Sequence, residues 1–399
     1  MKEKEYVDSI LVHYGEIALK GDNREYFEEK LVDNLCSALD GLSFESVRRK
    51  YGRVLVELGG TDGAKLSEYE ERVNRVFGIA NYAFVRTCSR DLDSIKKEAW
   101  ELVRSEDFSS FKVASRRSDK NYRLNSVELN EEVGAHLQQR YEQRGSPREV
   151  DLEEPDFTLY LEVTSSEVFV YKRKIDGPGG LPVGTAGKIV SLISAGIDSP
   201  VAAWKMMKRG AGVVFVHFHS FPRTDRASQE NVREVVEVLS SWQGWGKLYL
   251  VNIRSIQRKI ITKAPKRLRI IFYRRTMLRA AERIVGQENA KGVVTGDSLA
   301  QVSSQTLENL RATGESVSSS VPIYRPNIGM DKHEIEYRAR EIGTYEISSR
   351  SSRDCCVYMR PKHPETKASL NEVREIEQSL ETDDLISEAV ANSDIEEFG

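Results

Sequence analysis

A short loop rich in small, hydroxyl-bearing residues follows an apolar stretch near the middle of the chain. The segment SLISAGIDSPVAAW, residues 191–204, places Ser194, Gly196, Asp198 and Ser199 between a predicted strand and a predicted helix. Backbone N–H groups at the start of a helix can bind phosphate, and the helix dipole favours an anion there. The loop lacks the Lys-Ser/Thr pair of a Walker A loop, while Asp198 could hold a Mg²⁺ ion that bridges phosphate oxygens. The spacing therefore predicts a phosphate site of another type.

Two adjacent cysteines, Cys355 and Cys356, form a second candidate reactive group. The thiolate is the nucleophile of sulfur chemistry, and nearby arginines would favour it. One sulfur could carry a transferable atom and the other could resolve the product; two unreactive loop thiols are the alternative. The remaining cysteines, Cys36 and Cys88, lie in apolar surroundings and are expected to be buried fillers.

The composition is that of an ordinary multidomain protein. A chain of 399 residues is too long for one ordinary core, and its 30% charged residues leave a net charge of only −3. No apolar run approaches the roughly 18–20 residues that span a bilayer, and the N-terminal residues lack the pattern of a signal peptide. We therefore expect a cytoplasmic protein with no membrane partner.

Positive charge is concentrated in two runs. Residues 258–279 carry nine Lys or Arg and no acid, and residues 111–123 carry five basic residues and one acid. Basic clusters inside a near-neutral chain can mark a binding surface for a polyanion, although solvated helix faces are the alternative. The basic helix expected at 266–279 could continue such a surface, and the acidic residues 365–399 are expected to form a solvated helix.

Hydrophobic patterning divides the chain at a Gly- and Pro-rich linker, residues 174–188. Before it, short strands and amphipathic helices suggest two small α+β units. After it, apolar strands alternate with helices, which predicts a parallel sheet covered by helices on both faces. The expected strands are 188–194, 212–218, 247–253 and 292–296, and the expected helices are 199–209, 227–241 and 268–286. Ligands of such folds bind beyond the carboxyl ends of the strands, where the loop at 194–199 lies.

The S-x-G-x-D-S loop resembles the PP-loop of enzymes that cleave ATP between its α- and β-phosphates. Further motifs, in order and nearly end to end, resemble the ThiI-type tRNA sulfurtransferase family, the tRNA 4-thiouridine synthetases. These motifs are YGEIALKGDNREYFEEKL at 14–31, HFHSFPRTDRA at 217–227, YRRTMLRAAERI at 273–284, TGDSLAQVSSQTLENL at 295–310, RPNIGMDKHEI at 325–335 and IGTYEISSRSSRDCCVYMRPKHPET at 342–366.

This resemblance implies an α/β chain of three modules. A ferredoxin-like domain at 1–75 and a THUMP domain at 76–175, both α+β, would dock tRNA. A PP-loop domain at 176–399, of the adenine nucleotide hydrolase-like type with a Rossmann-like, doubly wound parallel sheet, would carry out the chemistry. The chain is expected to be a short form without a rhodanese domain. The resemblance also implies a part in sulfur supply for the thiazole of thiamine biosynthesis, although the rhodanese-dependent form of that role is not expected here.

The resemblance also implies the reaction. ATP adenylates O4 of uridine 8 in tRNA with release of pyrophosphate, and a persulfide sulfur then displaces AMP to give 4-thiouridine. The implied cofactors are ATP and Mg²⁺. A cysteine desulfurase or free sulfide would donate the sulfur, and a homodimer is the suggested assembly.

Site residues are assigned by matching this sequence to the family motifs. The catalytic residues would be Cys355, Cys356, Asp198 and Lys332, with Asp198 also the candidate Mg²⁺ ligand. The residues assigned to ATP binding are Leu192, Ile193, Ser194, Gly196, Ser199, His217, Phe218, Arg274, Gly296 and Gln305. The tRNA-binding candidates are Lys112, Arg116, Arg117, Lys120 and Arg123. Since strand residues alternate between faces, these five cannot all contact one ligand.

Other functions remain open at this point. Another PP-loop enzyme, such as a 2-thiouridine synthetase or an amide-forming synthetase, would share the ATP loop. An RNA-binding protein with a degenerate ATP site is a second alternative, and a THUMP-bearing methyltransferase is a third. AMP release that depends on tRNA would separate the sulfurtransferase from the synthetase of small molecules and from the RNA-binding protein.

Overall fold

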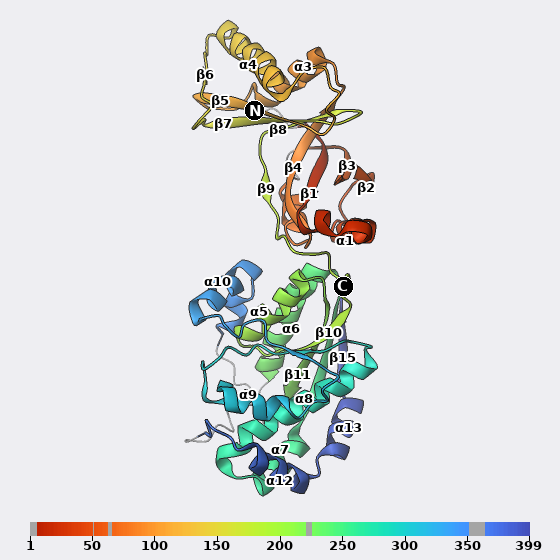
Figure 1. Cartoon of the computed structure of the whole chain (residues 1–399), viewed down its shortest axis with the longest axis vertical. Helices are drawn as coiled ribbons and strands as arrows, with labels where there is room; N and C mark the ends of the chain where they lie inside the picture. The colour runs from red at the N-terminus through yellow and green to blue at the C-terminus, as the bar shows by residue number, and fades with distance from the viewer. Residues whose placement is uncertain (1–5, 51, 63–65, 221–225, 351–363) are drawn as a thin grey trace. The chain divides into compact units, whose positions relative to one another are not determined.

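The computed structural model divides the chain into two compact units, Met1–Leu181 and Pro182–Gly399 (Figure 1). It describes residues 6–50, 52–62, 66–220, 226–350 and 364–399. The division falls inside the linker expected at 174–188. The first part of that segment is not a free linker, because strand β9 (Ile175–Asp176) pairs with strand β4 (Ile79–Cys88). No helix in the described ranges is long and apolar enough to cross a membrane.

One sheet runs through the described part of the first unit. Its strand order is β2-β3-β1-β4-β8-β7-β5-β6. The remaining bounds are β1 Tyr6–Tyr14, β2 Ser46–Lys50, β3 Arg53–Asp62, β5 Ser110–Arg117, β6 Glu149–Val150, β7 Phe157–Val163 and β8 Val168–Tyr171. Strand β4 joins the two halves, because residues 79–85 pair with β1 and residues 86–88 pair with β8.

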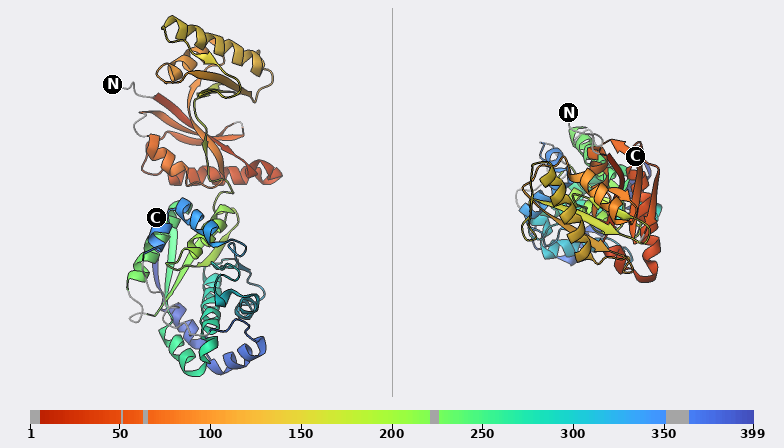
Figure 2. Two further views of the ribbon diagram at one scale, coloured as in Figure 1. Left: turned by 90° about the vertical axis from the view of Figure 1, so that its left-hand side faces the viewer. Right: turned by 90° about the horizontal axis from the view of Figure 1, so that it is seen from above.

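Each half of this sheet has its own helices (Figures 1 and 2). Helices α1 (Arg24–Ala38) and α2 (Leu66–Val73) pack against β1–β3. Two short 3-10 turns, η1 (Glu16–Leu19) and η2 (Gly21–Asn23), precede α1 in the sequence. Helices α3 (Leu92–Val103) and α4 (Ser126–Gln143) cover β5, β7 and β8. Helix α4 begins at Ser126, where Asn125 and Glu128 form a reciprocal capping box.

The second unit contains the predicted parallel sheet. Its strand order is β14-β13-β10-β11-β12-β15. The bounds are β10 Lys188–Leu192, β11 Gly212–His219, β12 Gly246–Asn252, β13 Val293–Val294, β14 Ile323–Tyr324 and β15 Asp394–Phe398. All neighbours pair in parallel except β15, which adds an antiparallel edge to β12. Every residue of β11 is buried, which explains its continuous apolar run.

Helices cover both faces of this sheet (Figure 1). Val214 and Val216 of β11 pack with α8 in the larger core, while α5 and α6 contact β11 from the other face. The bounds are α5 Asp198–Lys208, α6 Arg226–Gln243, α7 Arg254–Lys263, η4 Lys266–Leu268, α8 Arg269–Gln287, η5 Ser303–Gln305, α9 Leu307–Gly314, α10 Lys332–Ile342, α11 Tyr345–Ser348, α12 Leu370–Leu380 and α13 Asp383–Ala391. The predicted doubly wound architecture is therefore confirmed.

The acidic C-terminal segment is not the solvated helix that its composition suggests. It forms α12, α13 and the edge strand β15, and its acids neutralise arginines of the basic run at 258–279. The pairs are Arg267 with Glu365 (3.0 Å) and Glu372 (2.5 Å), Arg275 with Glu377, and Arg279 with Asp383. These arginines hold the C-terminal segment against η4 and α8. The expectation that the basic helix at 266–279 extends a tRNA surface stays a prediction.

Candidate active site

The predicted phosphate loop lies at the point where the strand order of the parallel sheet reverses. Strand β10 is flanked by β11 on one side and by β13 on the other. Chain connections leave this point in opposite directions along the sheet, which opens a crevice at the carboxyl ends of the strands. Residues 193–197 connect β10 to α5 at this crevice, and Gly296 follows β13 there.

Hydrogen bonds within the loop fix its two hydroxyl groups. The backbone N–H of Ser194 donates to Oγ of Ser199 (2.9 Å), and the two Oγ atoms lie 3.2 Å apart. The backbone N–H of Gly196 donates to Oγ of Ser194 (3.2 Å). Neither Ala195 nor Gly196 has a positive φ, so the alanine fits this turn without strain.

Gly296 is required by a close approach between β13 and the first turn of α5. A Cβ atom at this position would lie 2.7 Å from the backbone N of Ser199 and 2.9 Å from the carbonyl carbon of Asp198. Those contacts are backbone atoms that no side-chain rotation can move. The absence of a side chain therefore lets the two ligand-facing segments meet.

A cavity of about 240 Å³ opens at this junction. All ten residues predicted to bind ATP line it, together with Asp198. Four further lining residues were not predicted: Met277, Leu278, Thr295 and Asp297. Met277 and Leu278 follow Arg274 by three and four positions on α8, so helical periodicity could have placed them beside it.

Asp198 and Lys332 meet at the edge of this cavity. Nζ of Lys332, the first residue of α10, lies 3.4 Å from Oδ1 of Asp198. Nε2 of Gln301 donates to Oδ2 of the same carboxylate (3.3 Å). Both charged side chains are partly exposed, so they can exchange this pair for a ligand. Nothing in the described ranges gathers three or more His, Cys, Asp or Glu side chains into a metal cluster.

Asp297 is the electrostatic centre of the cavity wall. Its buried carboxylate pairs with Arg274 and with Nε of Arg325 (3.4 Å), and it accepts hydrogen bonds from Thr295 (2.7 Å) and Gln305 (3.3 Å). Burial alone would raise its pKa, but the charge and hydrogen bond of Arg274 and the bond from Thr295 together lower it. Asp297 is therefore ionised and fixes the orientation of Arg274.

Two histidines at the end of β11 are buried. Nδ1 of His217 lies 3.0 Å from the carbonyl oxygen of Ile193, so it contacts the strand that leads into the loop. Burial, followed by the influence of His217, lowers the pKa of His219 to about 4. His219 is therefore neutral at physiological pH.

Cys355 and Cys356 lie outside the described residues, but the segments on both sides are tied close to the cavity. Before them, Oγ of Ser348 lies 3.5 Å from the carbonyl oxygen of Gly196 in the phosphate loop. After them, Oγ1 of Thr306, which follows the cavity residue Gln305, donates to the carbonyl oxygen of Thr366 (2.7 Å). The described residues that flank this gap, Ser348 and Thr366, are thus each bonded to a segment that forms or adjoins the cavity.

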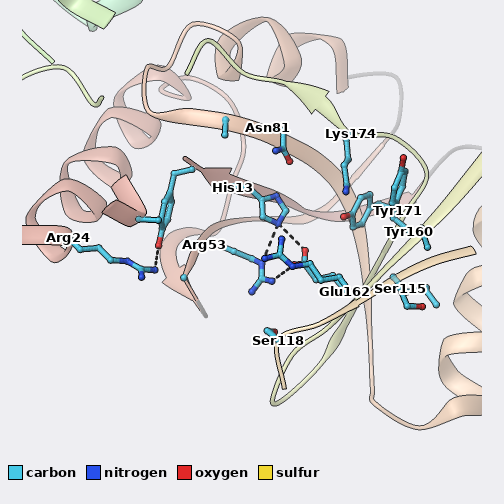
Figure 3. A pocket seen from close by; sticks show the side chains of 17 residues that line it. His13, Arg24, Arg53, Asn81, Ser115, Ser118, Tyr160, Glu162, Tyr171 and Lys174 are labelled. Atoms are coloured by element: carbon cyan, nitrogen blue, oxygen red, sulfur yellow. Dashed lines mark hydrogen bonds and ion pairs between the residues drawn. The ribbon is translucent and has the colours of Figure 1, made fainter. Parts of the chain in front are cut away.

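A second, larger cavity of about 550 Å³ lies within the first unit (Figure 3). At its centre, Glu162 is buried, pairs with Arg53 and lies 3.0 Å from Nε2 of His13. Burial would raise the pKa of Glu162, but these two partners lower it. Tyr160 and Tyr171 stack with ring centroids 5.1 Å apart. Arg24, Arg116 and Lys174 also line the wall, so the cavity combines aromatic faces with an excess of positive charge.

The five predicted tRNA contacts separate in the structure. Arg116 lines the second cavity, and Lys120 and Arg123 are exposed on the segment that follows β5. Nζ of Lys112 donates to the carbonyl oxygen of Leu152 (3.3 Å). Arg117 instead donates to the carbonyl oxygens of Tyr122 (3.3 Å) and Leu124 (2.9 Å), and it holds the turn after β5 in place. The guanidinium of Arg117 thus binds backbone oxygens of its own domain, whereas Arg116, on the opposite face of the strand, lines the cavity.

A small-residue loop at the switch point of a doubly wound sheet, with a carboxylate and a lysine at its edge, defines a PP-loop-type nucleotide site. Comparison with known proteins agrees with this class. The family model described as "Thiamine biosynthesis protein (ThiI)" matches residues 184–382, and models for the ThiI ferredoxin-like domain and the THUMP domain match residues 9–83 and 89–172. The chain belongs to the ThiI family.

Individual relatives cover the whole chain. Proteins described as "Probable tRNA sulfurtransferase" from Brevibacillus brevis and Moorella thermoacetica are each 41% identical to it. The first match covers 98% of this chain and 96% of the relative, and the second covers 97% of each. A 4-thiouridine synthetase crystallised as an RNA complex with bound ATP is 34% identical, with a TM-score of 0.88 over 98% of this chain and all of the other. The predicted ferredoxin-like, THUMP and PP-loop fold is confirmed.

Proposed function

We propose that this protein is an ATP-dependent tRNA sulfurtransferase. It adenylates O4 of uridine 8 in tRNA and then transfers a persulfide sulfur to C4, which gives 4-thiouridine and releases AMP. The observation that carries this proposal is the cavity at the switch point, where all ten predicted ATP-binding residues and Asp198 converge. Its similarity in sequence and fold to tRNA sulfurtransferases and to an RNA- and ATP-bound 4-thiouridine synthetase supports the same reaction.

Different residues of the cavity bind the adenosine, bind the pyrophosphate and neutralise the charge of the phosphates. His217 and Phe218 receive the adenosine, while the hydroxyls of Ser194 and Ser199 and the first N–H groups of α5 hold the pyrophosphate. Arg274, fixed by Asp297, and Lys332 carry the positive charge that opposes charge developing on the phosphates. The uracil O4 attacks the α-phosphorus, and pyrophosphate leaves.

A Mg²⁺ ion fits the donor set at the cavity edge. Mg²⁺ is commonly held by one or two carboxylates together with substrate phosphates and water. Asp198 offers one partly exposed carboxylate beside the loop hydroxyls, which matches that pattern. When bound, the ion would neutralise phosphate charge, and Lys332 would turn from the carboxylate toward the nucleotide.

The sulfur half of the reaction is assigned to Cys355 and Cys356. Burial raises the pKa of Cys36 and raises that of Cys88 to about 12, so neither is a ready thiolate. Cys355 and Cys356 are the remaining two thiols of the chain. A terminal persulfide sulfur attacks C4, AMP leaves, and the neighbouring thiolate then cleaves the S–S bond, which releases 4-thiouridine and leaves a disulfide between the two cysteines. Sulfide that attacks this disulfide regenerates a persulfide and a thiolate. A cysteine desulfurase instead transfers persulfide sulfur to a cysteine after a thiol reductant has reduced the disulfide.

The first unit is proposed to dock the tRNA. Folded RNA is recognised mainly by shape, phosphates and unpaired ends, and unpaired bases stack on aromatic side chains. Arg116 and Lys174 line the cavity and supply positive charge for RNA phosphates, beside the ring of Tyr160, which stacks on Tyr171 and lies under the Lys174 ammonium. We propose the division into modules 1–75, 76–175 and 176–399, a cytoplasmic location where tRNA is processed, and a homodimer as the working assembly.

The test is AMP formation from ATP with unmodified tRNA. Wild-type protein should form AMP only when tRNA is present, and Lys332→Met should lower the rate by about 100-fold, as expected for loss of one transition-state charge contact. Lys291→Met removes a lysine from the amino end of the same sheet and serves as the control. AMP formation without tRNA would instead indicate a synthetase for small molecules, and no AMP at all would refute the enzyme proposal.

A further inference from the structure

The residues 325–331 lie between β14 and α10, carry no residue assigned to the reaction, and lead directly into Lys332. The segment folds into two consecutive turns, in which Ile328 N–H donates to the carbonyl oxygen of Arg325 (3.1 Å) and Met330 N–H donates to that of Asn327 (3.0 Å). It ends at Asp331, which forms a capping box with Glu334 at the start of α10. Lys332 is therefore held in the first turn of α10.

Asn327 ties this segment to the phosphate loop. Its side chain has 0% exposure, and its Nδ2 donates to the backbone carbonyl oxygen of Asp198 (2.8 Å). The amide orientation follows from this contact, since a flipped amide would place two carbonyl oxygens against each other. The partner is the same Asp198 whose carboxylate lies 3.4 Å from Lys332 Nζ.

A second tie comes from the phosphate-loop helix itself. Nζ of Lys205, two turns along α5, donates to the carbonyl oxygen of Pro326 (2.6 Å) and lies 2.9 Å from Sδ of Met330. Ser298 Oγ donates to the carbonyl oxygen of Met330 (2.8 Å). Neither Asn327 nor Lys205 lines the nucleotide cavity, so neither is placed to touch ATP directly.

We propose that Asn327 is a positioning residue for adenylation, which sets where the start of α10, and with it Lys332, lies relative to the phosphate loop by fastening the 325–331 segment to that loop. This inference rests on the proposed function, since it assigns Lys332 the task of neutralising phosphate charge. Asn327 contributes to the rate through the position of Lys332. It does not contribute to ATP affinity through a contact of its own.

The test compares Asn327→Ala with Gln243→Ala. Gln243 is also buried and also donates its amide to a backbone carbonyl oxygen, that of Val213 (3.0 Å), but at the amino end of β11. With saturating ATP and tRNA, the single-turnover rate of AMP formation should fall by about 100-fold in Asn327→Ala, as a 1 Å misplacement of a catalytic group can cost. The dissociation constant for ATP of Asn327→Ala should change by no more than about threefold. Gln243→Ala should lose stability but should keep the wild-type rate and dissociation constant.

A double-mutant cycle separates positioning from general damage. Because Asn327 acts through Lys332, adding Asn327→Ala to Lys332→Met should lower the residual rate by no more than about threefold. Additive losses in the double variant would overturn the proposal. The proposal would also be overturned if Asn327→Ala formed AMP at the same rate as Gln243→Ala. It would likewise be overturned if the ATP affinity of Asn327→Ala fell as much as its rate. A wild-type protein that forms no AMP with tRNA would instead refute the proposed function.

Discussion

Replacing Gly296 with alanine tests the geometry of the nucleotide site through a single methyl group. The new Cβ would lie 2.7 Å from the backbone N of Ser199, whereas ordinary contacts begin near 3.4 Å, so the end of β13 and the start of α5 must separate by about 0.7 Å. Overpacking of this kind typically costs about 1–3 kcal/mol of stability. Because Gly296 and Ser199 both line the cavity, the displacement falls on the phosphate-binding residues, and a shift approaching 1 Å can cost about 100-fold.

The assay is equilibrium binding of ATP together with unfolding in urea, for Gly296→Ala and for Gly286→Ala. Gly286 lies near the end of α8, where a Cβ atom would meet nothing within 4 Å. Gly286→Ala should therefore bind ATP normally and gain up to about 1 kcal/mol from helix propensity. Gly296→Ala should lose at least about tenfold in ATP affinity. If Gly296→Ala bound ATP as tightly as wild type and unfolded at the same urea concentration, the close approach that defines this site would be wrong.

Three further changes have definite expected outcomes. Ala300 has a φ of 60°, a left-handed conformation that costs an L residue about 1–2 kcal/mol. After the greater conformational entropy of unfolded glycine is subtracted, Ala300→Gly should stabilise the protein by about 0.5–1 kcal/mol in urea unfolding. Destabilisation would contradict this expectation. Arg275 is buried between Glu377 and the carbonyl oxygen of Ala312. Arg275→Ala should therefore lower the free energy of unfolding by about 3 kcal/mol. A decrease below about 1 kcal/mol would show that this arginine does not hold the C-terminal segment. The pKa of His219 is about 4 in the folded protein and about 6.5 in the unfolded chain. The contribution of the neutral, buried imidazole to the free energy of unfolding is therefore fully present above pH 6.5 and is lost as the pH falls to 4, by about 3 kcal/mol. A His219→Asn variant should show a flatter profile of stability against pH between those values.

The elements that carry the site could be predicted because their signals are local. The run KIVSLIS is apolar along a buried strand, and the residues 194–199 that follow are small and polar, so strand, loop and helix can be read from neighbouring residues. Repetition of the βα pattern then places the loop at the carboxyl edge of a parallel sheet. The family motifs add Arg274, Gly296, Gln305 and Lys332, which the structure brings to the same crevice.

Long-range pairing could not be predicted from composition. Arg267, Arg275 and Arg279 look like a polyanion surface when only their neighbours in sequence are considered, yet their partners come from the acidic segment about 100 residues later. Arg117 has the same charge as Arg116 one position away, but strand alternation turns it inward to the carbonyl oxygens of residues 122 and 124. The role of Asn327 likewise depends on a contact across 129 residues.

The most direct test of the proposed function is single-turnover transfer of labelled sulfur to unmodified tRNA. The reaction contains ATP, Mg²⁺ and a cysteine desulfurase with labelled cysteine, and it compares a tRNA bearing uridine 8 with one bearing cytidine at that position. We expect labelled 4-thiouridine only with uridine 8, and we expect Asp198→Asn and Cys355→Ala each to abolish it. Equal labelling of both tRNAs, or labelling that proceeds without ATP, would contradict the proposed function.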